Sequence, residues 1–216
     1  MSDKDHGLTR REFLKGAGLT AAGAALASGA MVAIGAASVV AQEAGGGAPK
    51  PAVLGPGPVK ITLNVNGADR KLEVEPRTTL AEALRLDLDL TGTKVVCDRG
   101  SCSACTVMLM GRPVCACMTL AIDAADAPIT TIEGLAKGDQ LHPVQACFVK
   151  HDATQCGFCT PGMVMSCAAL LERNTAPTLD DVRAATSGNL CRCGTYPKVF
   201  AATLEAATLT AAKGGK

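Results

Sequence analysis

The chain has 216 residues, with 21 Lys and Arg, 20 Asp and Glu, 11 Cys and only five aromatic residues. This length suits one or two compact domains, and a formal net charge of +1 supplies no polybasic patch for nucleic acid or anionic lipid. So few aromatic side chains exclude an aromatic-filled core or a base-stacking platform. The 11 cysteines are therefore the feature that a function has to explain.

The first 41 residues have the pattern of an export signal. Arg10 and Arg11 precede 26 uncharged residues, of which 16 are Gly or Ala and only seven are Leu, Ile, Val or Met. This weak hydrophobicity argues against a membrane span, and the lack of a polar face argues against a surface helix. We expect residues 1–41 to be a twin-arginine signal that sends the protein to the periplasm, whereas an uncleaved signal would anchor it in the membrane. Without these residues the chain keeps 17 basic and 17 acidic side chains.

A linker and a hairpin follow the signal. Residues 42–58 are rich in Gly and Pro and predict a flexible linker. Residues 59–65 alternate apolar and polar, Asn66-Gly67 is a tight-turn pair, and the alternation resumes over residues 71–75. This pattern predicts a β-hairpin.

The rest of the first half predicts one helix and more short strands. Thr78 and Thr79 offer a cap for the apolar residues that follow at helical spacing. Strands are expected at 106–110 and 129–132, with a turn at 111–113. A small mixed sheet crossed by one helix predicts a β-grasp ferredoxin domain over residues 59–134.

The second half has the period of helices rather than strands. Apolar residues recur at three- and four-residue intervals, and Asp180 and Asp181 give one of the segments an acidic first turn. We therefore expect a four-helix domain over residues 135–210 and a tail at 211–216, which makes the fold class α+β. The expected helical segments are 139–151, 161–173, 178–187 and 197–210.

The first cysteine group has the spacing of a plant-type [2Fe-2S] site. Cys97, Cys102 and Cys105 form Cys-x4-Cys-x2-Cys, to which a distant fourth cysteine is added in such sites. Cys117 is one candidate for the fourth position. Cys115 competes with it, because a residue two positions earlier on the same strand would lie on the same face.

The second group comprises Cys156 and Cys159, then Cys191 and Cys193. Both pairs fall at expected helix starts, where the helix dipole and free backbone N–H groups favour thiolates and an anionic cluster. Zinc could also bind such a set. Disulfides are a further alternative in an exported protein, although the odd number of cysteines argues against a scaffold built only of disulfides.

Other reactive residues are expected to be structural. Cys147 and Cys167 lie on apolar helical faces and predict small buried hydrophobes. Met163 and Met165 predict core filler, and two isolated histidines beside helices, His142 and His151, predict structural roles. No Ser-His-Asp set or carboxylate pair suggests a general base or nucleophile.

The chain resembles the iron-sulfur subunit of the xanthine oxidase family of molybdenum hydroxylases from about residue 59 to 208. The segments that carry the resemblance are Leu90-Thr91-Gly92-Thr93-Lys94, Cys97-Asp98-Arg99-Gly100-Ser101-Cys102, Ala104-Cys105-Thr106-Val107, His142-Pro143-Val144-Gln145, Gln155-Cys156-Gly157-Phe158-Cys159-Thr160-Pro161-Gly162 and Gly188-Asn189-Leu190-Cys191-Arg192-Cys193. Two separate signatures in this order make a chance match improbable.

The resemblance implies two [2Fe-2S] clusters and a separate large subunit that holds molybdopterin with molybdenum. It favours Cys117 over Cys115, and it implies that Cys193 contacts the pterin amine with Gln155 as a hydrogen-bonding neighbour. The implied ligands of the outer cluster are Cys97, Cys102, Cys105 and Cys117, and those of the inner cluster are Cys156, Cys159, Cys191 and Cys193.

The chain departs from the family pattern at three places. Ser103 stands where the family usually has Gly after the second ligand, and Val96 stands where Gly often precedes the first. Gly194-Thr195 reverses the commoner order after the last ligand, which resembles the branch of exported aldehyde oxidoreductases and isoquinoline 1-oxidoreductases.

The function that the resemblance implies is electron transfer as the non-catalytic subunit of a molybdenum oxidoreductase. Electrons from oxidation of an aldehyde or an N-heterocycle would pass from the pterin through both clusters to an acceptor, such as an FAD-binding subunit or a cytochrome. A stand-alone exported ferredoxin is the alternative, and it predicts a polar rather than an apolar surface around Gln155 and Cys193. A zinc- or disulfide-stabilised binding module is the third possibility.

Overall fold

The computed structural model describes residues 55–214. The expected signal, most of the expected linker and the last two residues of the expected tail lie outside this range. Within the described residues, no helix is both long and apolar enough to cross a bilayer.

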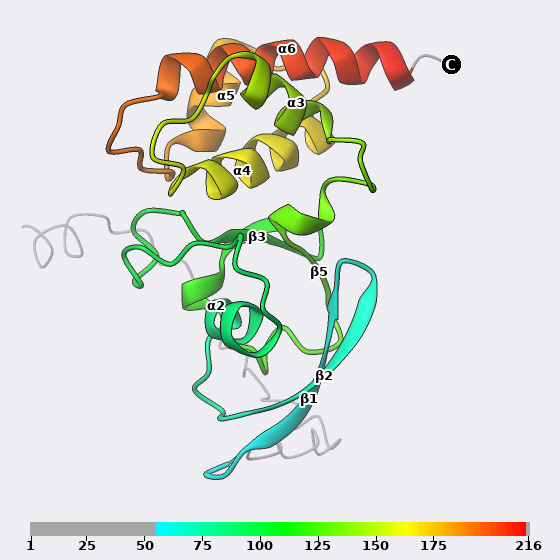
Figure 1. Cartoon of the computed structure of the whole chain (residues 1–216), viewed down its shortest axis with the longest axis vertical. Coiled ribbons are helices and arrows are strands. Elements are labelled where there is room, and N and C mark those ends of the chain that lie inside the picture. The colour runs from blue at the N-terminus through cyan, green and yellow to red at the C-terminus, as the bar shows by residue number, and fades with distance from the viewer. Residues whose placement is uncertain (1–54, 215–216) are drawn as a thin grey trace, which may run out of the picture. The chain divides into compact units, whose positions relative to one another are not determined.

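A five-stranded mixed sheet forms the first half of the described chain (Figure 1). Its strands lie in the order β2-β1-β5-β3-β4, and β1 pairs with β5 in parallel while the other pairs are antiparallel. Neighbours in this sheet come from distant parts of the sequence, so the hairpins alone do not specify it. The strands are β1 (Val59–Val65), β2 (Ala68–Val74), β3 (Thr106–Leu109), β4 (Arg112–Cys115) and β5 (Pro128–Thr130).

The predicted first hairpin is confirmed. Val65 pairs with Ala68 across the turn, and Asn66 and Gly67 have φ angles of 54° and 81°. Positive φ at both turn residues is the requirement of a type I′ turn, which Asn-Gly satisfies best. The Asn66 carboxamide also accepts the backbone N–H of Thr131 at 2.9 Å, which ties the turn to the end of β5.

The predicted helix begins where its cap was expected. Thr79 caps α2 (Leu80–Glu82), and its hydroxyl and the Glu82 carboxylate satisfy each other's backbone N–H in a capping box. The helix continues as a π-helical turn, η1 (Ala83–Asp87). Its buried residues Leu80 and Leu84 belong to the core beneath the sheet.

Two local predictions were wrong by one or two residues. The turn between β3 and β4 is Met110-Gly111, both with positive φ, so Arg112 and Pro113 belong to β4. The strand expected at 129–132 ends at Thr130, and Ile132 starts the 3-10 helix η3 (Ile132–Gly134). At the turn, pairing of Leu109 with Arg112 and of Met108 with Pro113 extends into the residues that were expected to be turn. At the end of β5, Ile132 continues the apolar pattern although the strand has already ended.

Four α-helices follow η3 in the described residues, in the order expected. The first predicted helix was too long, because Pro143 starts α3 and the preceding residues form a turn. The last extends four residues beyond the expected end. The helices are α3 (Pro143–Lys150), α4 (Thr160–Arg173), α5 (Leu179–Thr186) and α6 (Tyr196–Gly214).

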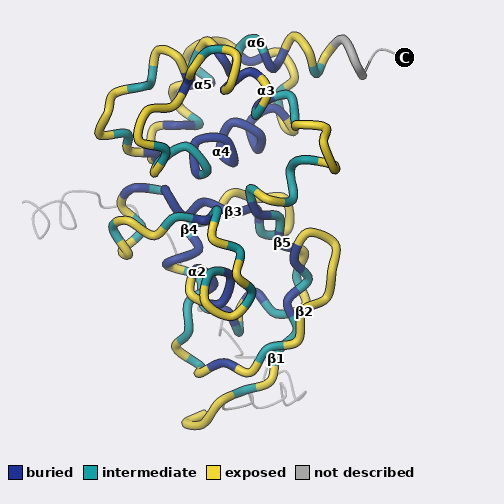
Figure 2. Tube along the Cα trace, viewed as in Figure 1, coloured by how far each residue is buried: buried dark blue, intermediate teal, exposed yellow. Residues whose placement is uncertain are grey.

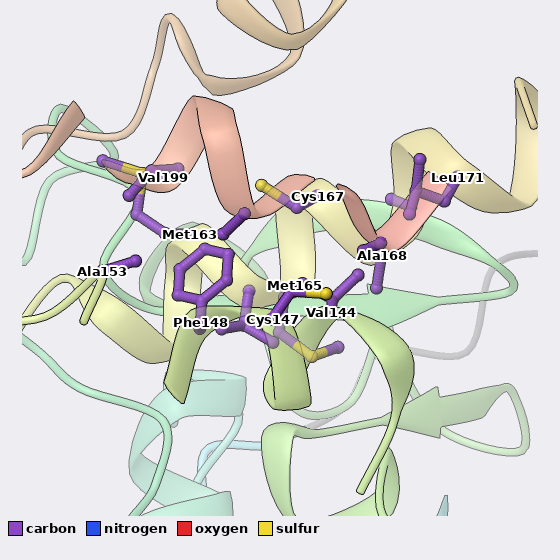
Figure 3. Packing of buried hydrophobic residues seen from close by; sticks show 14 of the residues in the cluster. Val144, Cys147, Phe148, Ala153, Met163, Met165, Cys167, Ala168, Leu171 and Val199 are labelled. Atoms are coloured by element: carbon purple, nitrogen blue, oxygen red, sulfur yellow. The ribbon is translucent and has the colours of Figure 1, made fainter. Parts of the chain in front are cut away.

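Helix α4 is the buried element of the helical half (Figure 2). Residues 162–171 are all buried, and Met163, Met165 and Cys167 pack with Val144, Cys147 and Phe148 of α3 (Figure 3). This confirms that Cys147 and Cys167 are buried and that both methionines are core residues.

Strand β3 separates two hydrophobic cores. Val107 points into the core shared with α2, whereas Met108 belongs to the core of the helical half. Successive side chains on a strand point to opposite faces, so β3 serves both cores. Gly162 of α4 lies so close that a Cβ there would come 2.2 Å from the Ser103 carbonyl oxygen.

Candidate iron-sulfur sites

The first cysteine group lies on the loop between η1 and β3. Cys102 and Cys105 are buried and Cys97 is half-buried. The loop turns sharply because Gly100 has a φ of 70°, as expected for the residue type that adopts this region at least cost. The thiols of Cys97 and Cys102 are neighbours that affect each other's pKa.

Cys117 is brought to this loop from beyond β4. Its thiol interacts with that of Cys105, and its Sγ accepts the backbone N–H of Gly100 at 3.4 Å. Cys115 ends β4, and its Sγ lies 3.6 Å from the Ser103 hydroxyl oxygen. The expectation that the two share one strand face was wrong, because Cys117 lies in the 3-10 helix η2 (Ala116–Met118).

Hydrogen bonds and burial shift the pKa values of two of these thiols in opposite directions. Backbone N–H groups, chiefly that of Arg99, together with the Cys102 thiol, lower the pKa of Cys97 to about 7. Burial raises the pKa of Cys105 to about 12, and the adjacent Cys117 thiol adds to this effect. Buried neighbouring thiolates repel each other, so a bound cationic centre would favour the thiolate form of Cys105.

The second group lies on the loops that precede α4 and α6. Cys156 and Cys193 are exposed, whereas Cys159 and Cys191 are half-buried. The thiols of Cys156 and Cys193 are neighbours that affect each other's pKa, as are those of Cys159 and Cys191. Each pair thus joins one cysteine before α4 to one before α6.

Thr195, at the start of α6, holds Cys191. Its hydroxyl lies 3.2 Å from the Cys191 Sγ and its backbone N–H donates to the same sulfur at 3.4 Å. Burial opposes the thiolate, but these hydrogen bonds outweigh it and lower the pKa of Cys191 to about 7. Burial raises the pKa of Cys159 to about 12, with the Cys191 thiol adding to the effect. Cys191 therefore receives N–H donors at a helix N-terminus, as expected. Cys159, the N-cap of α4, makes no side-chain capping hydrogen bond, so the expectation does not hold for it.

The geometry fits a two-iron cluster better than a single ion. In the described residues, no three His, Cys, Asp or Glu side chains form a group that could hold one metal ion. The thiols come instead as two pairs in each site, and a [2Fe-2S] cluster with four thiolates takes two on each iron. All 11 cysteines lie in the described range, and none of them forms a disulfide. A disulfide-stabilised module would need such bonds, so the structure gives no support to that alternative.

The remaining predicted residues are placed as follows. His142 is the N-cap of α3, and its Nδ1 accepts the Val144 N–H at 3.3 Å. His151 is the C-cap of α3 and contacts Glu205 at 2.6 Å. Gln155 lies beside Cys193 on a groove of about 490 Å³. The histidines therefore have the structural roles expected of them.

Two residues at the sites were not singled out by their chemistry in the sequence. Asn189 is 3% exposed, and its carboxamide donates to the Ser103 carbonyl at 3.1 Å. The Tyr196 hydroxyl accepts the Cys191 N–H at 2.8 Å and donates to the Asn189 carbonyl at 3.1 Å. The usable signals were weak, namely that Tyr196 is the only tyrosine of the chain and that Asn189 stands in the Gly-Asn-Leu-Cys motif.

Three family models match the chain. A 2Fe-2S iron-sulfur cluster binding domain matches residues 63–150, and a [2Fe-2S] binding domain matches residues 131–204. A twin-arginine translocation signal matches residues 7–27, which supports export by that pathway.

Curated and solved relatives agree with these models. The aldehyde oxidoreductase iron-sulfur-binding subunit PaoA of Escherichia coli K12 is 44% identical, over 94% of this chain and 90% of that protein. The nicotinate dehydrogenase small FeS subunit of Eubacterium barkeri is also 44% identical, over 67% and 92%. The crystal structure of quinoline 2-oxidoreductase from Pseudomonas putida 86 contains a chain with a TM-score of 0.70 and 44% identity, over 73% of this chain and 98% of that one.

A ferredoxin-like domain followed by a helical domain, each with a [2Fe-2S] signature, defines an electron-transfer protein with two clusters. The relatives make it an oxidoreductase subunit rather than a stand-alone ferredoxin. The chain belongs to the iron-sulfur subunits of the xanthine oxidase family of molybdenum hydroxylases.

Proposed function

We propose that this chain carries electrons from the molybdopterin centre of a large subunit to an external acceptor through two clusters bound at named cysteines. The observation that carries the proposal is that the fold gathers eight thiols into two sites, with Cys117 brought to the outer loop and the loops before α4 and α6 brought to each other. The outer site would use Cys97, Cys102, Cys105 and Cys117, and the inner site Cys156, Cys159, Cys191 and Cys193.

The inner site is the part of the chain that would contact the pterin of the large subunit. Cys193 and Gln155 line the same groove, and Cys193 is exposed in the isolated chain. The groove also contains Asp152, Thr195 and Lys198, so it is more polar than the apolar surface expected of a docking site. Polar groups suit a pterin, whose amine needs a hydrogen-bond acceptor, and the Cys193 sulfur and the Gln155 side-chain carbonyl can both accept.

Exposed apolar side chains next in sequence to the assigned inner-site cysteines support a bound large subunit. Phe158 is 60% exposed and Leu190 is 56% exposed, and both stand next to ligand cysteines. A second groove of about 300 Å³, between α3 and α4, has a mainly apolar lining that includes Leu141 and Val149. Exposed apolar surface of this kind marks interfaces.

The chain's residues bind and orient the redox centres and move no proton. When bound, the clusters supply one-electron transfer. Backbone N–H groups of Gly100 and Ser101 donate to Cys117 and Cys97, and Thr195 donates to Cys191. Such hydrogen bonds to sulfur, with the burial of Cys102 and Cys105, are the means by which a protein tunes cluster potential and excludes water.

The finer features of the fold and setting are part of the same proposal. The sheet with its crossing helix supports a β-grasp, plant-type ferredoxin domain over residues 59–134 and a four-helix cluster domain over 135–210, between a flexible linker at 42–58 and a tail at 211–216. The relatives act on aldehydes and N-heterocycles by their names, and we infer the same substrate classes for the complex. The twin-arginine match supports a periplasmic location after cleavage of residues 1–41, and an FAD-binding subunit or a cytochrome would accept the electrons.

Low-temperature EPR of the dithionite-reduced full chain tests the ligand assignment. We expect two distinct S = 1/2 signals, with Cys117→Ser altering one and Cys193→Ser altering the other. Cys115→Ser is the matched control, because this thiol lies near the outer loop and is not assigned as a ligand. If the outer-cluster signal were lost in Cys115→Ser and kept in Cys117→Ser, the outer ligand set would be refuted. A wild-type chain without iron after cluster reconstitution would refute the proposal.

A further inference from the structure

The two candidate sites are joined by the backbone. The N–H of Leu190 donates to the carbonyl oxygen of Cys102 at 3.0 Å. Leu190 precedes the inner-site residue Cys191, and Cys102 belongs to the outer site. A single hydrogen bond therefore links the peptide units next to one assigned ligand of each cluster.

The Asn189 side chain holds this link in place from the neighbouring position. Its carboxamide Nδ2 donates to the Ser103 carbonyl at 3.1 Å, one residue beyond Cys102. Two successive carbonyls of the outer loop, those of Cys102 and Ser103, are thus held by the successive residues Leu190 and Asn189 in antiparallel order. Asn189 is 3% exposed, so water cannot readily replace the lost partner if the amide is removed.

The outer half of this contact is under strain. Ser103 has a φ of 52°, in the left-handed region that favours glycine. Its carbonyl also accepts the Thr106 hydroxyl at 2.7 Å, and it faces Gly162 of α4. A strained residue keeps its conformation only when its surroundings fix it, and Asn189 is one of the groups that fix it.

The inner half is fixed by α6. The Tyr196 hydroxyl donates to the Asn189 carbonyl and accepts the Cys191 N–H. The segment from Asn189 to Cys191 is therefore tied to α6 by Tyr196 and to the outer loop by Asn189 and Leu190.

We propose that Asn189 is a positioning residue for electron transfer between the two clusters, and that its amide keeps the hydrogen bond from Leu190 to Cys102 formed as the connecting path. One electron leaves the inner cluster and reduces the outer one, and no bond forms or breaks. The inference rests on the proposed function, because it needs a cluster at each site. The inference adds to that function a residue that binds neither iron nor pterin. This residue sets the rate of electron transfer between the two clusters and their magnetic coupling.

The test uses the reconstituted full chain carrying Asn189→Ala or Asn189→Leu, the second of which keeps the branched side-chain shape but has no donor. Asn174→Ala is the matched control, since Asn174 caps the turn before α5 through Ala176 and Asp181. The first readout is the magnetic splitting between the two fully reduced clusters in EPR. The second is pulse radiolysis, in which one electron per chain is added and its redistribution between the clusters is followed optically.

We expect both Asn189 variants to keep two S = 1/2 EPR signals, one for each cluster. The magnetic splitting between the clusters should weaken, and the rate of electron transfer between them should fall by about tenfold or more, because displacements near 1 Å have large effects on positioned reacting groups. Asn174→Ala should match wild type. Tyr196→Phe gives a second variant at the inner end and should lower the rate in the same direction.

Three results would overturn the inference. Asn189 variants with wild-type splitting and rate would show that the amide does not couple the clusters. Variants that lose a cluster signal, or that fail to fold while Tyr196→Phe transfers electrons at the wild-type rate, would show that Asn189 only supports assembly of the site. A wild-type chain lacking two [2Fe-2S] signals would refute the proposed function itself and, with it, this inference.

Discussion

Gly162→Ala should destabilise the protein, because α4 touches the outer loop at this glycine without room for a methyl group. A Cβ at residue 162 would stand 2.2 Å from the Ser103 carbonyl oxygen and 3.1 Å from the Cα of Ala104. These are backbone atoms, and the Ser103 carbonyl already accepts hydrogen bonds from Asn189 and Thr106. Neither the loop nor the helix can therefore move away without breaking other interactions.

The expected size follows from two opposing effects. Overpacking a close contact costs about 1–3 kcal/mol, whereas replacing Gly by Ala within a helix gains at most about 1 kcal/mol. The gain is small here because Gly162 is only the third residue of α4. The net loss of about 1–2 kcal/mol corresponds to a fall in Tm of about 2–8 °C for a chain of this size.

Thermal unfolding followed by circular dichroism at one fixed scan rate measures this loss, with two glycines as matched controls. At Gly188 the nearest atom to a new Cβ is the Ser103 hydroxyl at 3.2 Å, which can rotate away, and at Gly57 nothing lies within 4 Å. Gly188→Ala should have a small effect and Gly57→Ala should stay within about 0.5 kcal/mol of wild type. A Gly162→Ala chain that melts at or above the wild-type temperature would refute the packing argument.

Two further predictions concern an ion-pair cluster and the docking surface. Hydrogen bonds from Lys150 and then His151 hold the pKa of Glu205 below its ordinary value of 4.5, so this carboxylate adds stability above about pH 4.5 that is lost as pH falls through its lowered folded pKa. Glu205→Gln should therefore flatten the fall in Tm on acidification from about pH 5 to 3, and parallel curves for variant and wild type would contradict this. Phe158→Ser should weaken association with the large subunit by about tenfold or more, as the loss of an aromatic anchor does, and leave both EPR signals intact. In a pull-down with that subunit, Leu86→Ser at a side chain 78% exposed on η1 is the control, and equal capture of both variants would count against docking at Phe158.

Local chemistry in the sequence was enough to predict most elements. Asn66-Gly67 specifies its turn by backbone conformation alone, and Thr79, one of the two expected caps, caps α2 through Glu82 three positions on. The cysteine spacings predicted two cluster sites because three ligands of one site, and each half of the other, lie within a few residues. The errors fell at ends of elements, where pairing partners rather than composition decide the boundary.

Other features depended on residues far apart in the chain. The sequence left Cys115 and Cys117 open as fourth ligand apart from the family resemblance. The structure places Cys117 in η2 against Cys105 and Gly100, and Cys117 as the ligand stays a proposal. Serine at position 103 was a departure without an explanation. The structure gives it a left-handed conformation held by contacts 86 residues away in the sequence, from Asn189.

The sequence by itself therefore determined which cysteines are available, how they divide into two groups, and the order of a sheet-containing part and a helical part, since these depend on spacing and on periodicity over short ranges. Only the tertiary structure decided which thiols pair, that α4 packs against the outer loop at Gly162, and that Leu190 and Cys102 connect the two sites. The physical reason is that hydrogen bonds and van der Waals contacts depend on distances between groups, and for residues distant in the chain those distances exist only after both cores have packed on the two faces of β3.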